Sequence, residues 1–262
     1  MPNSALQVAR TGLEAQDTRM RVIANNLANV GTTGYKRDRA NFATLAYQDQ
    51  RVAGQQSSSE TAYATGLNLG TGVSVQSTSR IITQGTLANT GNALDLALDG
   101  EGYFQVELPG GQLAYTRAGN FTRSPTGELV TVQGYRVQPA ITIPEDAQSI
   151  TVAQDGTVSA VTSGSSETTE LGQLQVAAFA NPAGLQAAGD NFLMETSASG
   201  QANLGAAGDA GRGHIRQAML EGSNVNVVEE LVDMIECQRA YEINSKMISA
   251  IDEMLRNANQ TM

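Results

Sequence analysis

The chain has 262 residues, of which 16 are basic and 26 acidic, giving a net charge of −10, and it contains one cysteine and one histidine. Nucleic acids and anionic membrane surfaces bind concentrated positive charge, so this composition argues against both as the main partner. A single cysteine excludes an intramolecular disulfide, and the cysteine and histidine counts exclude metal sites built from clusters of these residues.

The first thirty residues carry a heptad pattern with one polar break at Gln16. Its two series are Leu6, Leu13, Met20 and Leu27, and Ala9, Gln16, Ile23 and Val30. This spacing predicts a helix that ends near Gly31. The segment lacks the apolar core of a secretory signal, so we expect any export to proceed without a cleaved signal peptide. No apolar run approaches the length of a transmembrane helix.

An extended segment is expected near Asn41–Tyr47, followed by the polar stretch Gln48–Ser59. The composition of that stretch is typical of an exposed arm or linker. A strand is expected over Val73–Thr83. The glycines of Gly66–Gly72 precede no Lys-Ser/Thr pair and no helix, which excludes a phosphate loop.

From residue 94 to about residue 179 the pattern predicts β structure throughout. Pro109-Gly110-Gly111 predicts a hairpin turn between two of these strands. Residues 198–213 are rich in Gly and Ala and predict a loop, and residues 214–220 predict a last strand.

The stretch Asn226–Leu255 contains no Gly or Pro and predicts a helix roughly 45 Å long. Asn226 is expected to cap it, with Glu229 completing a capping box. Apolar positions cover more of this helix than the stripe of about 100° that one partner helix covers, so neighbouring chains are the expected partners. Cys237 is interpreted as a small buried apolar residue.

The predicted fold is α+β, with long N- and C-terminal helices paired as an antiparallel coiled coil and enclosing a mostly antiparallel β middle domain. The predicted domains are a helical core (1–30 and 226–262), a connecting extended or β domain (31–93 and 187–225, with an arm at 48–69) and a β domain (94–186). Residues on the apolar faces of the two helices are the predicted subunit interface: Leu6, Leu13, Met20, Ile23, Leu27, Val30, Val227, Leu231, Met234, Tyr241, Met247, Ile248, Ile251 and Leu255. The heptads alone fit an ordinary two-helix core in a monomer equally well, and the wide apolar arc of the last helix favours several neighbours.

No catalytic site is expected. A Ser-His-acid triad would need His214, and no serine lies in a Gly-x-Ser-x-Gly elbow. Paired carboxylates serve glycosidases, and Asp95, Asp99 and Glu101 form an acidic trio. The simpler interpretation is that they end a strand and accept hydrogen bonds in turns. The trio also lacks the spacing of an EF-hand loop, so neither a metal nor a cofactor is expected.

Residues 24–36 read ANNLANVGTTGYK, and residues 223–232 read SNVNVVEELV with QRAYE following at 238–242. Between them lie LDGEGYF at 98–104 and YTRAGNF at 115–121. Together these segments resemble the N-terminal, C-terminal and β-domain signatures of the bacterial flagellar rod and hook protein family, over nearly the whole chain. The motif residues carried over are Asn25, Asn26, Asn29, Thr33, Gly34, Tyr35, Asn224, Asn226, Glu229, Arg239 and Tyr241.

The resemblance implies a structural subunit that polymerises into a rigid helical tube around an export channel and transmits torque from motor to hook. It implies a place in the basal-body rod, from the periplasm to the outer membrane, reached by flagellar type III export. The implied partners are copies of itself, proximal rod proteins, the hook protein or the hook–rod junction, P-ring and L-ring proteins, and the export apparatus with a rod-assembly factor. Neither nucleic acid nor membrane insertion is implied.

Within that family, the chain length and the segment Gln48–Leu69 are similar to the distal-rod branch. The resemblance implies an arm that stiffens the tube, with Gln48, Gln55, Gln56, Ser57, Ser58 and Leu69 as its residues. A proximal-rod or hook-type subunit is the alternative within the family. An exported peptidoglycan hydrolase using Asp95 and Glu101 is the alternative of another class.

Overall fold

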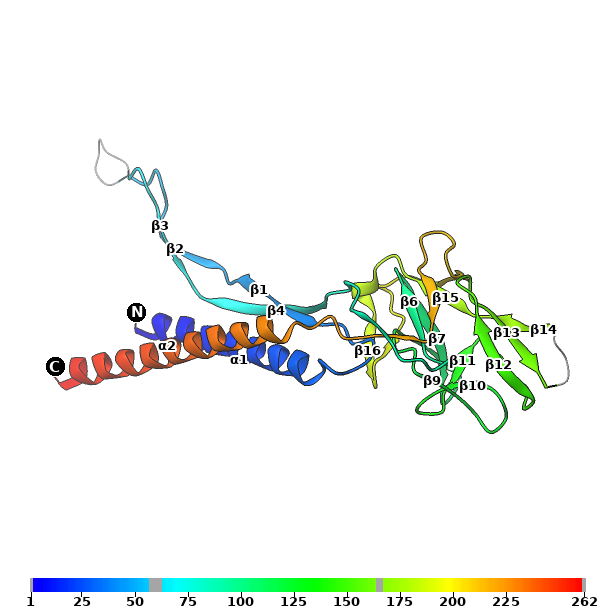
Figure 1. Cartoon of the computed structure of the whole chain (residues 1–262). Coiled ribbons are helices and arrows are strands. Elements are labelled where there is room, and N and C mark those ends of the chain that lie inside the picture. Colours follow the sequence, from blue (N-terminus) through cyan, green and yellow to red (C-terminus); the bar gives the residue numbers. More distant parts are fainter. Residues whose placement is uncertain (1, 57–62, 164–166, 261–262) are drawn as a thin grey trace. The chain divides into compact units, whose positions relative to one another are not determined.

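The computed structural model describes residues 2–56, 63–163 and 167–260 (Figure 1). The chain divides into two compact units. Unit 1 consists of Met1–Ala28, Asp38–Ser79 and Asn226–Met262, and unit 2 consists of residues 29–37 and 80–225. The chain therefore crosses between the units at residues 28–29, 37–38, 79–80 and 225–226.

Unit 1 is built on two long helices, α1 (Pro2–Ala28) and α2 (Val227–Gln260). The predicted cap of α2 is confirmed, because the side-chain oxygen of Asn226 accepts the Val228 N–H at 3.1 Å. Helix α2 extends beyond its predicted end at residue 255, since residues 256–260 contain no Gly or Pro to stop it.

The two helices lie against each other, as Figure 1 shows. The Cys237 thiol donates to the Gln16 carbonyl at 3.1 Å, and Arg19 pairs with Asp233 at 2.9 Å. These contacts run in opposite directions along the two helices, so α1 and α2 are antiparallel.

The predicted coiled coil is nevertheless wrong, because the seam between the helices holds mainly small and polar side chains with two isoleucines, and not layers of Leu and Met. The buried residues of the two helices are Ala9, Ala15, Ile23 and Asn26 on α1, and Glu230, Cys237 and Ile251 on α2. At Gly12 the approach is so close that a Cβ would lie 3.1 Å from the Asn244 side chain. The heptad residues Leu6, Leu13, Met20 and Leu27 stay only partly buried. Knobs-into-holes packing requires such residues to fill the seam.

Two strand pairs complete the described part of unit 1. Strand β1 (Asp38–Thr44) pairs with β4 (Val73–Arg80), and β2 (Tyr47–Arg51) pairs antiparallel with β3 (Leu67–Gly70). The β2–β3 hairpin occupies the position of the predicted arm, and nearly all of its residues are exposed. Gln48, Gln55, Gln56 and Leu69 are exposed, whereas Ser57 and Ser58 lie outside the described residues.

In the part of unit 2 that the structure describes, the chain forms a β body whose largest sheet has nine strands joined by antiparallel pairs. In spatial order, seven of them run β16-β17-β8-β7-β11-β10-β9, and β15 pairs with both β7 and β18. Their bounds are β7 (Tyr103–Leu108), β8 (Gln112–Thr116), β9 (Phe121–Arg123), β10 (Leu129–Thr131), β11 (Arg136–Gln138), β15 (Gln175–Ala178), β16 (Gln186–Gly189), β17 (Phe192–Met194) and β18 (Asn203–Ala206). A 3-10 turn, η1 (Pro182–Gly184), precedes β16.

The predicted hairpin is confirmed, because β7 and β8 pair up to Leu108 and Gln112 on either side of the Pro109–Gly111 turn. The predicted loop at residues 198–213 is wrong in its centre, which forms β18. The Gly- and Ala-rich composition conceals this strand, and pairing with β15 overrides its low intrinsic β propensity.

Smaller sheets complete unit 2. They comprise β12 (Ala147–Val152), β13 (Thr157–Thr162) and β14 (Thr168–Gln173); β6 (Leu96–Asp99) with β19 (His214–Gln217); and β5 (Leu87–Asn89) with β20 (Met219–Glu221). The predicted last strand is therefore two strands, divided at Ala218, whose φ is +60°. The core gathers apolar side chains from several sheets, with the Phe104 and Phe121 rings edge to face at 5.2 Å.

Candidate functional site

Helix α2 has an uncovered apolar face on the side away from α1. Five large apolar side chains on it are at least half exposed: Val228 (69%), Val232 (52%), Ile235 (50%), Ile243 (61%) and Met254 (64%). At 100° per residue they fall within an arc of roughly 100°. The buried residues Glu230, Cys237 and Ile251 lie on the other side of the helix. A helix with two apolar faces and one partner leaves an interaction surface open.

The free face of α1 is polar, in contrast to that of α2. Two exposed ion pairs span it, Arg10 with Glu14 at 3.0 Å and Asp17 with Arg21 at 2.7 Å. Such i,i+4 pairs are typical of a solvated helix face. The uncovered apolar surface of the helices therefore lies mainly on α2.

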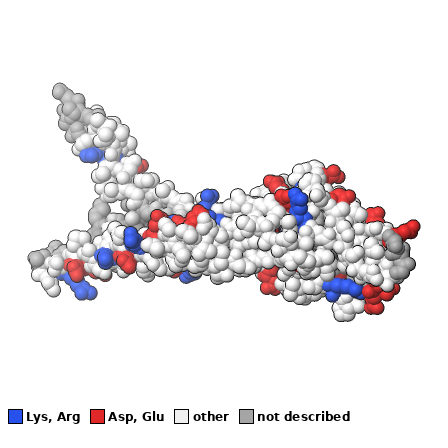
Figure 2. Space-filling model, in the orientation of Figure 1, with Lys and Arg blue, Asp and Glu red and all other residues white. Residues whose placement is uncertain are grey.

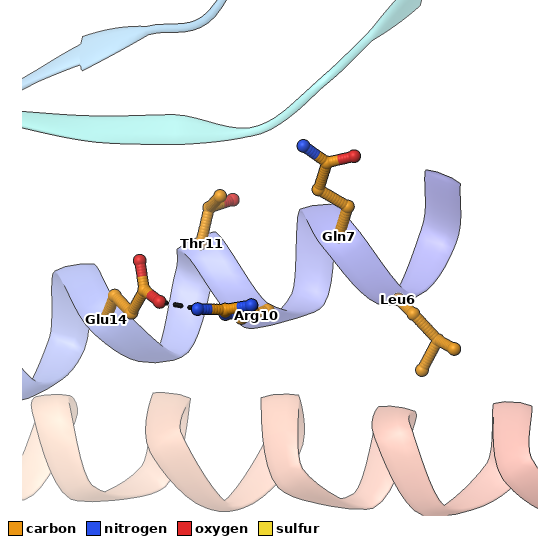
Figure 3. A pocket seen from close by; sticks show the side chains of 5 residues that line it. All are labelled: Leu6, Gln7, Arg10, Thr11 and Glu14. Carbon is orange, nitrogen blue, oxygen red and sulfur yellow. Dashed lines mark hydrogen bonds and ion pairs between the residues drawn. The ribbon is translucent and has the colours of Figure 1, made fainter. Parts of the chain in front are cut away.

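A groove of about 480 Å³ runs along α1 (Figure 3). In Figure 3 Leu6 points toward the neighbouring helix, whereas Gln7 and Thr11 point toward the extended strand. The Thr11 hydroxyl accepts the Val73 N–H at 3.3 Å, which holds β4 beside the helix. Figure 2 shows that most of the visible surface carries no charged side chain, so the charged groups form isolated spots.

The predicted interface residues occupy different environments. Ile23 and Ile251 are buried. The partly buried members are Leu6, Leu13, Met20, Leu27, Met234, Ile248 and Leu255. The exposed members are Val30, Val227, Leu231, Tyr241 and Met247.

The predicted set contains none of the five residues of this outer face, and it omits Val228, Val232 and Ile235 at the start of the helix. A signal for them was present, because they follow one another at i, i+4 and i+7. That spacing marks a stripe but does not say which of two apolar stripes an adjoining helix covers.

A second feature, within unit 2, is a group of buried charges around Glu221, whose side chain is fully buried. Its Oε1 accepts Lys36 Nζ at 2.5 Å and the Gly85 N–H at 3.0 Å, and its Oε2 accepts Arg117 Nη1 at 3.2 Å. Lys36 also donates to the Thr83 carbonyl at 2.8 Å. One carboxylate thus joins segments that lie far apart in the sequence.

The two cations of this group are as deeply buried as the carboxylate, at 3% side-chain exposure each. Burial lowers the pKa of Lys36, and the hydrogen bond and charge of Glu221 oppose that shift. Arg117 also donates to the Gly100 carbonyl at 2.8 Å and lies over the Tyr103 ring at 5.4 Å. Burial raises the pKa of Tyr103.

Asn224 ties two neighbouring segments together beside this charge group. Its side-chain oxygen accepts the Arg37 N–H at 2.7 Å, and its amide donates to the carbonyls of Ile81 at 2.9 Å and Thr83 at 3.0 Å. Among side chains, only an amide has two N–H donors on one atom and a carbonyl acceptor on another, so it alone can make all three of these hydrogen bonds at once. We call Lys36, Arg117, Glu221 and Asn224 together the connector anchor.

Asn26 makes the corresponding contacts within unit 1. It exchanges two hydrogen bonds of 2.9 Å with the backbone of Asp38 and donates to the buried Glu230 carboxylate at 3.2 Å. The end of α1, the start of β1 and the first turn of α2 are thereby joined.

Two glycines of the quoted motifs are required by close backbone approach. Gly34 has φ of +69°, and a Cβ there would lie 2.6 Å from the Ala118 nitrogen. A Cβ on Gly119 would lie 1.5 Å from the Leu96 carbonyl oxygen. These positions admit no other residue without backbone movement.

The remaining motif residues are held by hydrogen bonds, buried, or exposed on the helices. The Asn29 side chain accepts the Thr32 hydroxyl at 3.1 Å, and the Thr33 carbonyl accepts Asn191 Nδ2 at 2.8 Å. Tyr35 is buried. Asn25, Glu229, Arg239 and Tyr241 are exposed on the helices.

Two members of the acidic trio make structural side-chain contacts, and the third makes a backbone contact. Asp95 accepts the Thr90 hydroxyl at 2.6 Å and Asn92 Nδ2 at 3.0 Å, and Asp99 pairs with Arg216 at 3.0 Å. The Glu101 carbonyl accepts a backbone N–H.

His214 lies opposite Asp99 in the β6–β19 pair. Within the described residues, no three or more His, Cys, Asp or Glu side chains gather as a metal site would require. No described helix has the length and apolar character needed to cross a membrane.

Three family models match separate parts of the chain. Residues 6–36 match "Flagella basal body rod protein", residues 97–160 match "Flagellar hook protein FlgE/F/G D1 domain", and residues 216–261 match "Flagellar basal body rod FlgEFG protein C-terminal". Each match contains part of the connector anchor, with Lys36 in the first, Arg117 in the second, and Glu221 and Asn224 in the third.

Full-length relatives agree with these matches. The chain is 49% identical to flagellar basal-body rod protein FlgG of Agrobacterium fabrum, over 95% of this chain and 96% of the relative. It is 47% identical to flagellar basal-body rod protein FlgG of Caulobacter vibrioides, over 98% of both. With flagellar basal-body rod protein FlgF of that same organism, the identity is 34% over 94% of both.

Proposed function

The chain belongs to the flagellar basal-body rod protein family, and from that premise we propose that it builds the distal part of the rod as a helical homopolymer around an export channel. As a member of that family it is a structural protein of the flagellar basal body and not an enzyme. The identity of 47% to FlgG against 34% to FlgF within one organism favours the distal-rod branch over a sibling rod subunit.

The uncovered outer face of α2 carries the proposal for polymerisation. In a helical polymer each subunit offers two different surfaces and the contacts do not close into a ring. Burial of this face against neighbouring copies would contribute about 25 cal/mol per Å² of apolar area. We therefore propose that α1 and α2 form the wall of the channel and that the outer face of α2 contacts the next copies.

Helices without cover are marginal in isolation, so assembly and ordering are coupled in this proposal. Hydrogen exchange on the unassembled chain is expected to show fast exchange over residues 2–28 and 227–255, with protection gained on assembly. Protection of these residues in the monomer would contradict the coupling.

Electron microscopy of the purified, concentrated chain is the direct test of the function. Straight tubes of uniform width are the expected result. A chain that stays monomeric at every concentration, and that also fails to form rods in cells lacking their own rod protein, would refute the proposed function.

The β2–β3 arm is proposed to fill gaps between subunits and to stiffen the tube. Because Tyr47 and Gly70 are cross-strand partners, residues 48–69 can be replaced by a two-residue Asn-Gly turn without moving the flanking strands. This variant is expected to form tubes that bend. If it forms no tubes at all, the arm is needed for assembly itself and not for stiffness.

The partners proposed for the tube are the proximal rod proteins, the hook or hook–rod junction, and the P-ring and L-ring proteins. We propose export through the flagellar type III apparatus, assisted by a rod-assembly factor. The support is family membership, which places the protein in the basal body with other rod and hook components.

A further inference from the structure

The segments by which the chain enters and leaves unit 2 are all held by one group of side chains. Unit 2 receives the chain at residues 29 and 80 and releases it at residues 37 and 225. Lys36 and the backbone of Arg37 hold the first segment, and the backbone of residues 81–85 holds the second. Glu221 and Asn224 belong to the third. Any force on unit 2 that travels along the chain passes through these segments.

We propose that the connector anchor is the point at which torque enters the β body of unit 2. The inference rests on the proposed role as a torque-transmitting rod subunit. It assigns Glu221 as the shared acceptor of the segments and Arg117 as their link to the β body, through the Gly100 carbonyl.

The hydrogen-bond pattern supports a mechanical role. Segments that donate to one acceptor are linked to one another through it, so force on one segment is passed directly to the others. Bonds to charged groups are the strong class of hydrogen bond, and exclusion of water strengthens them further. Pulling on residue 37, 80 or 225 therefore loads the same buried carboxylate or the adjoining Asn224 amide.

A gain in thermal stability does not explain why this buried group is charged. Two cations and one carboxylate are buried together, and desolvation of such charges offsets most of their attraction. An apolar cluster of the same volume would stabilise unit 2 at least as well. Directional bonds that fix three segments against displacement are what the charged group adds.

Pulling experiments on the full chain, tethered at its two ends, test the proposal directly. Glu221→Gln keeps the shape of the side chain but removes its charge. At constant force, unit 2 of this variant is expected to unfold about 10- to 100-fold faster than the parent. Ile141→Val is the matched control, because it reduces thermal stability in the core without touching a connector. Asp99→Asn removes an exposed ion pair of unit 2 and serves as the second control.

The deciding quantity is the loss of mechanical resistance relative to the loss of Tm. The proposal expects Glu221→Gln to lose far more mechanical resistance per degree of Tm lost than Ile141→Val does. Equal losses would overturn it and leave Glu221 a merely structural residue. If Glu221→Gln does not fold, Asn224→Asp replaces it, since it removes the two amide bonds to Ile81 and Thr83 at a partly exposed site. Resistance equal to that of the parent would then overturn the proposal.

Rotation of beads on cells that carry each variant in place of their own rod protein gives the second measurement. Glu221→Gln is expected to rotate normally at low viscosity and to stop or break at high viscosity, whereas Asp99→Asn matches the parent at both. Normal torque from Glu221→Gln at high viscosity would refute the anchor. Failure of the parent chain to support any rotation would refute the proposed function instead, and the pulling result would be unaffected.

Discussion

Truncation of Ile243 to Ala tests whether the outer face of α2 becomes buried on assembly. Ile243 is 61% exposed in the pair of helices α1 and α2, so its truncation changes few contacts with α1 once that pair has formed. Ala is also a better helix former than Ile, so the helix itself is not weakened. Any effect on polymerisation therefore reports on contacts with other copies.

The size of the effect follows from the exposed fraction. Full burial of an Ile side chain is worth about 1.5–3 kcal/mol, so burial of the exposed three-fifths contributes about 1–2 kcal/mol. Since 1.4 kcal/mol is tenfold in an equilibrium constant, the critical concentration for polymerisation should rise about 5- to 30-fold.

Sedimentation of polymer over a concentration series measures that threshold, and circular dichroism of the sedimented polymer shows whether α1 and α2 still form. Ser245→Ala is the control, because Ser245 is exposed on the polar arc of the same helix. It should leave the threshold unchanged. An unchanged threshold in Ile243→Ala, or an equal rise in both variants, would refute the assignment of this face.

Two further predictions concern turns and close contacts within unit 2. Gly119→Ala drives a Cβ into the Leu96 carbonyl, so it should lower the free energy of unfolding by at least the roughly 1–3 kcal/mol typical of overpacking, as measured by denaturant unfolding. Gly31→Ala is the control and should be neutral, because no atom lies within 4 Å of its added Cβ. Equal effects of the two substitutions would contradict the packing. The Thr157 N–H, with the Thr157 hydroxyl, holds the pKa of Asp155 below its ordinary value of 3.8. The stability gained from this turn is therefore complete above pH 3.8 and lost as pH falls through the lower pKa of the folded state. Asp155→Asn should remove that part of the pH dependence of Tm, and an unchanged acid limb would refute it.

Periodicity located the helices but not the way in which they pack. The heptad series of α1 contains Ala9, but the interface predicted from it kept only large apolar members such as Leu13 and Met20. Ala9 and Gly12 decide the outcome, because they let α2 approach within contact distance of the α1 backbone. Close approach leaves the longer residues at the edges of the seam, and that result depends on side-chain size, which a hydrophobic pattern does not contain.

The connector anchor was beyond reach of sequence reasoning for a different reason. Glu221 ends a three-residue strand and has no local feature that distinguishes it from an exposed carboxylate. Its partners Lys36 and Arg117 are 185 and 104 residues away. Only the tertiary fold brings them together, and a single sequence contains no record of such pairs. Gly34, which lies two residues before Lys36, gave a partial signal for the turn in this segment, since a turn glycine is expected to adopt positive φ.

The residues that identify the family and the residues that are proposed to join its subunits obey different physical constraints. Asn26, Gly34 and Asn224 each occupy a position defined by donor and acceptor geometry or by backbone approach, which one residue type satisfies. The outer face of α2 requires only bulk and apolar character, so Val232 should tolerate Ile or Leu, because volume-conserving apolar changes cost little. Asn224→Asp, although nearly isosteric, loses two donated bonds inside unit 2. A signature motif in this chain therefore marks how its connectors are fixed, and the surface that meets other copies follows from a looser apolar pattern.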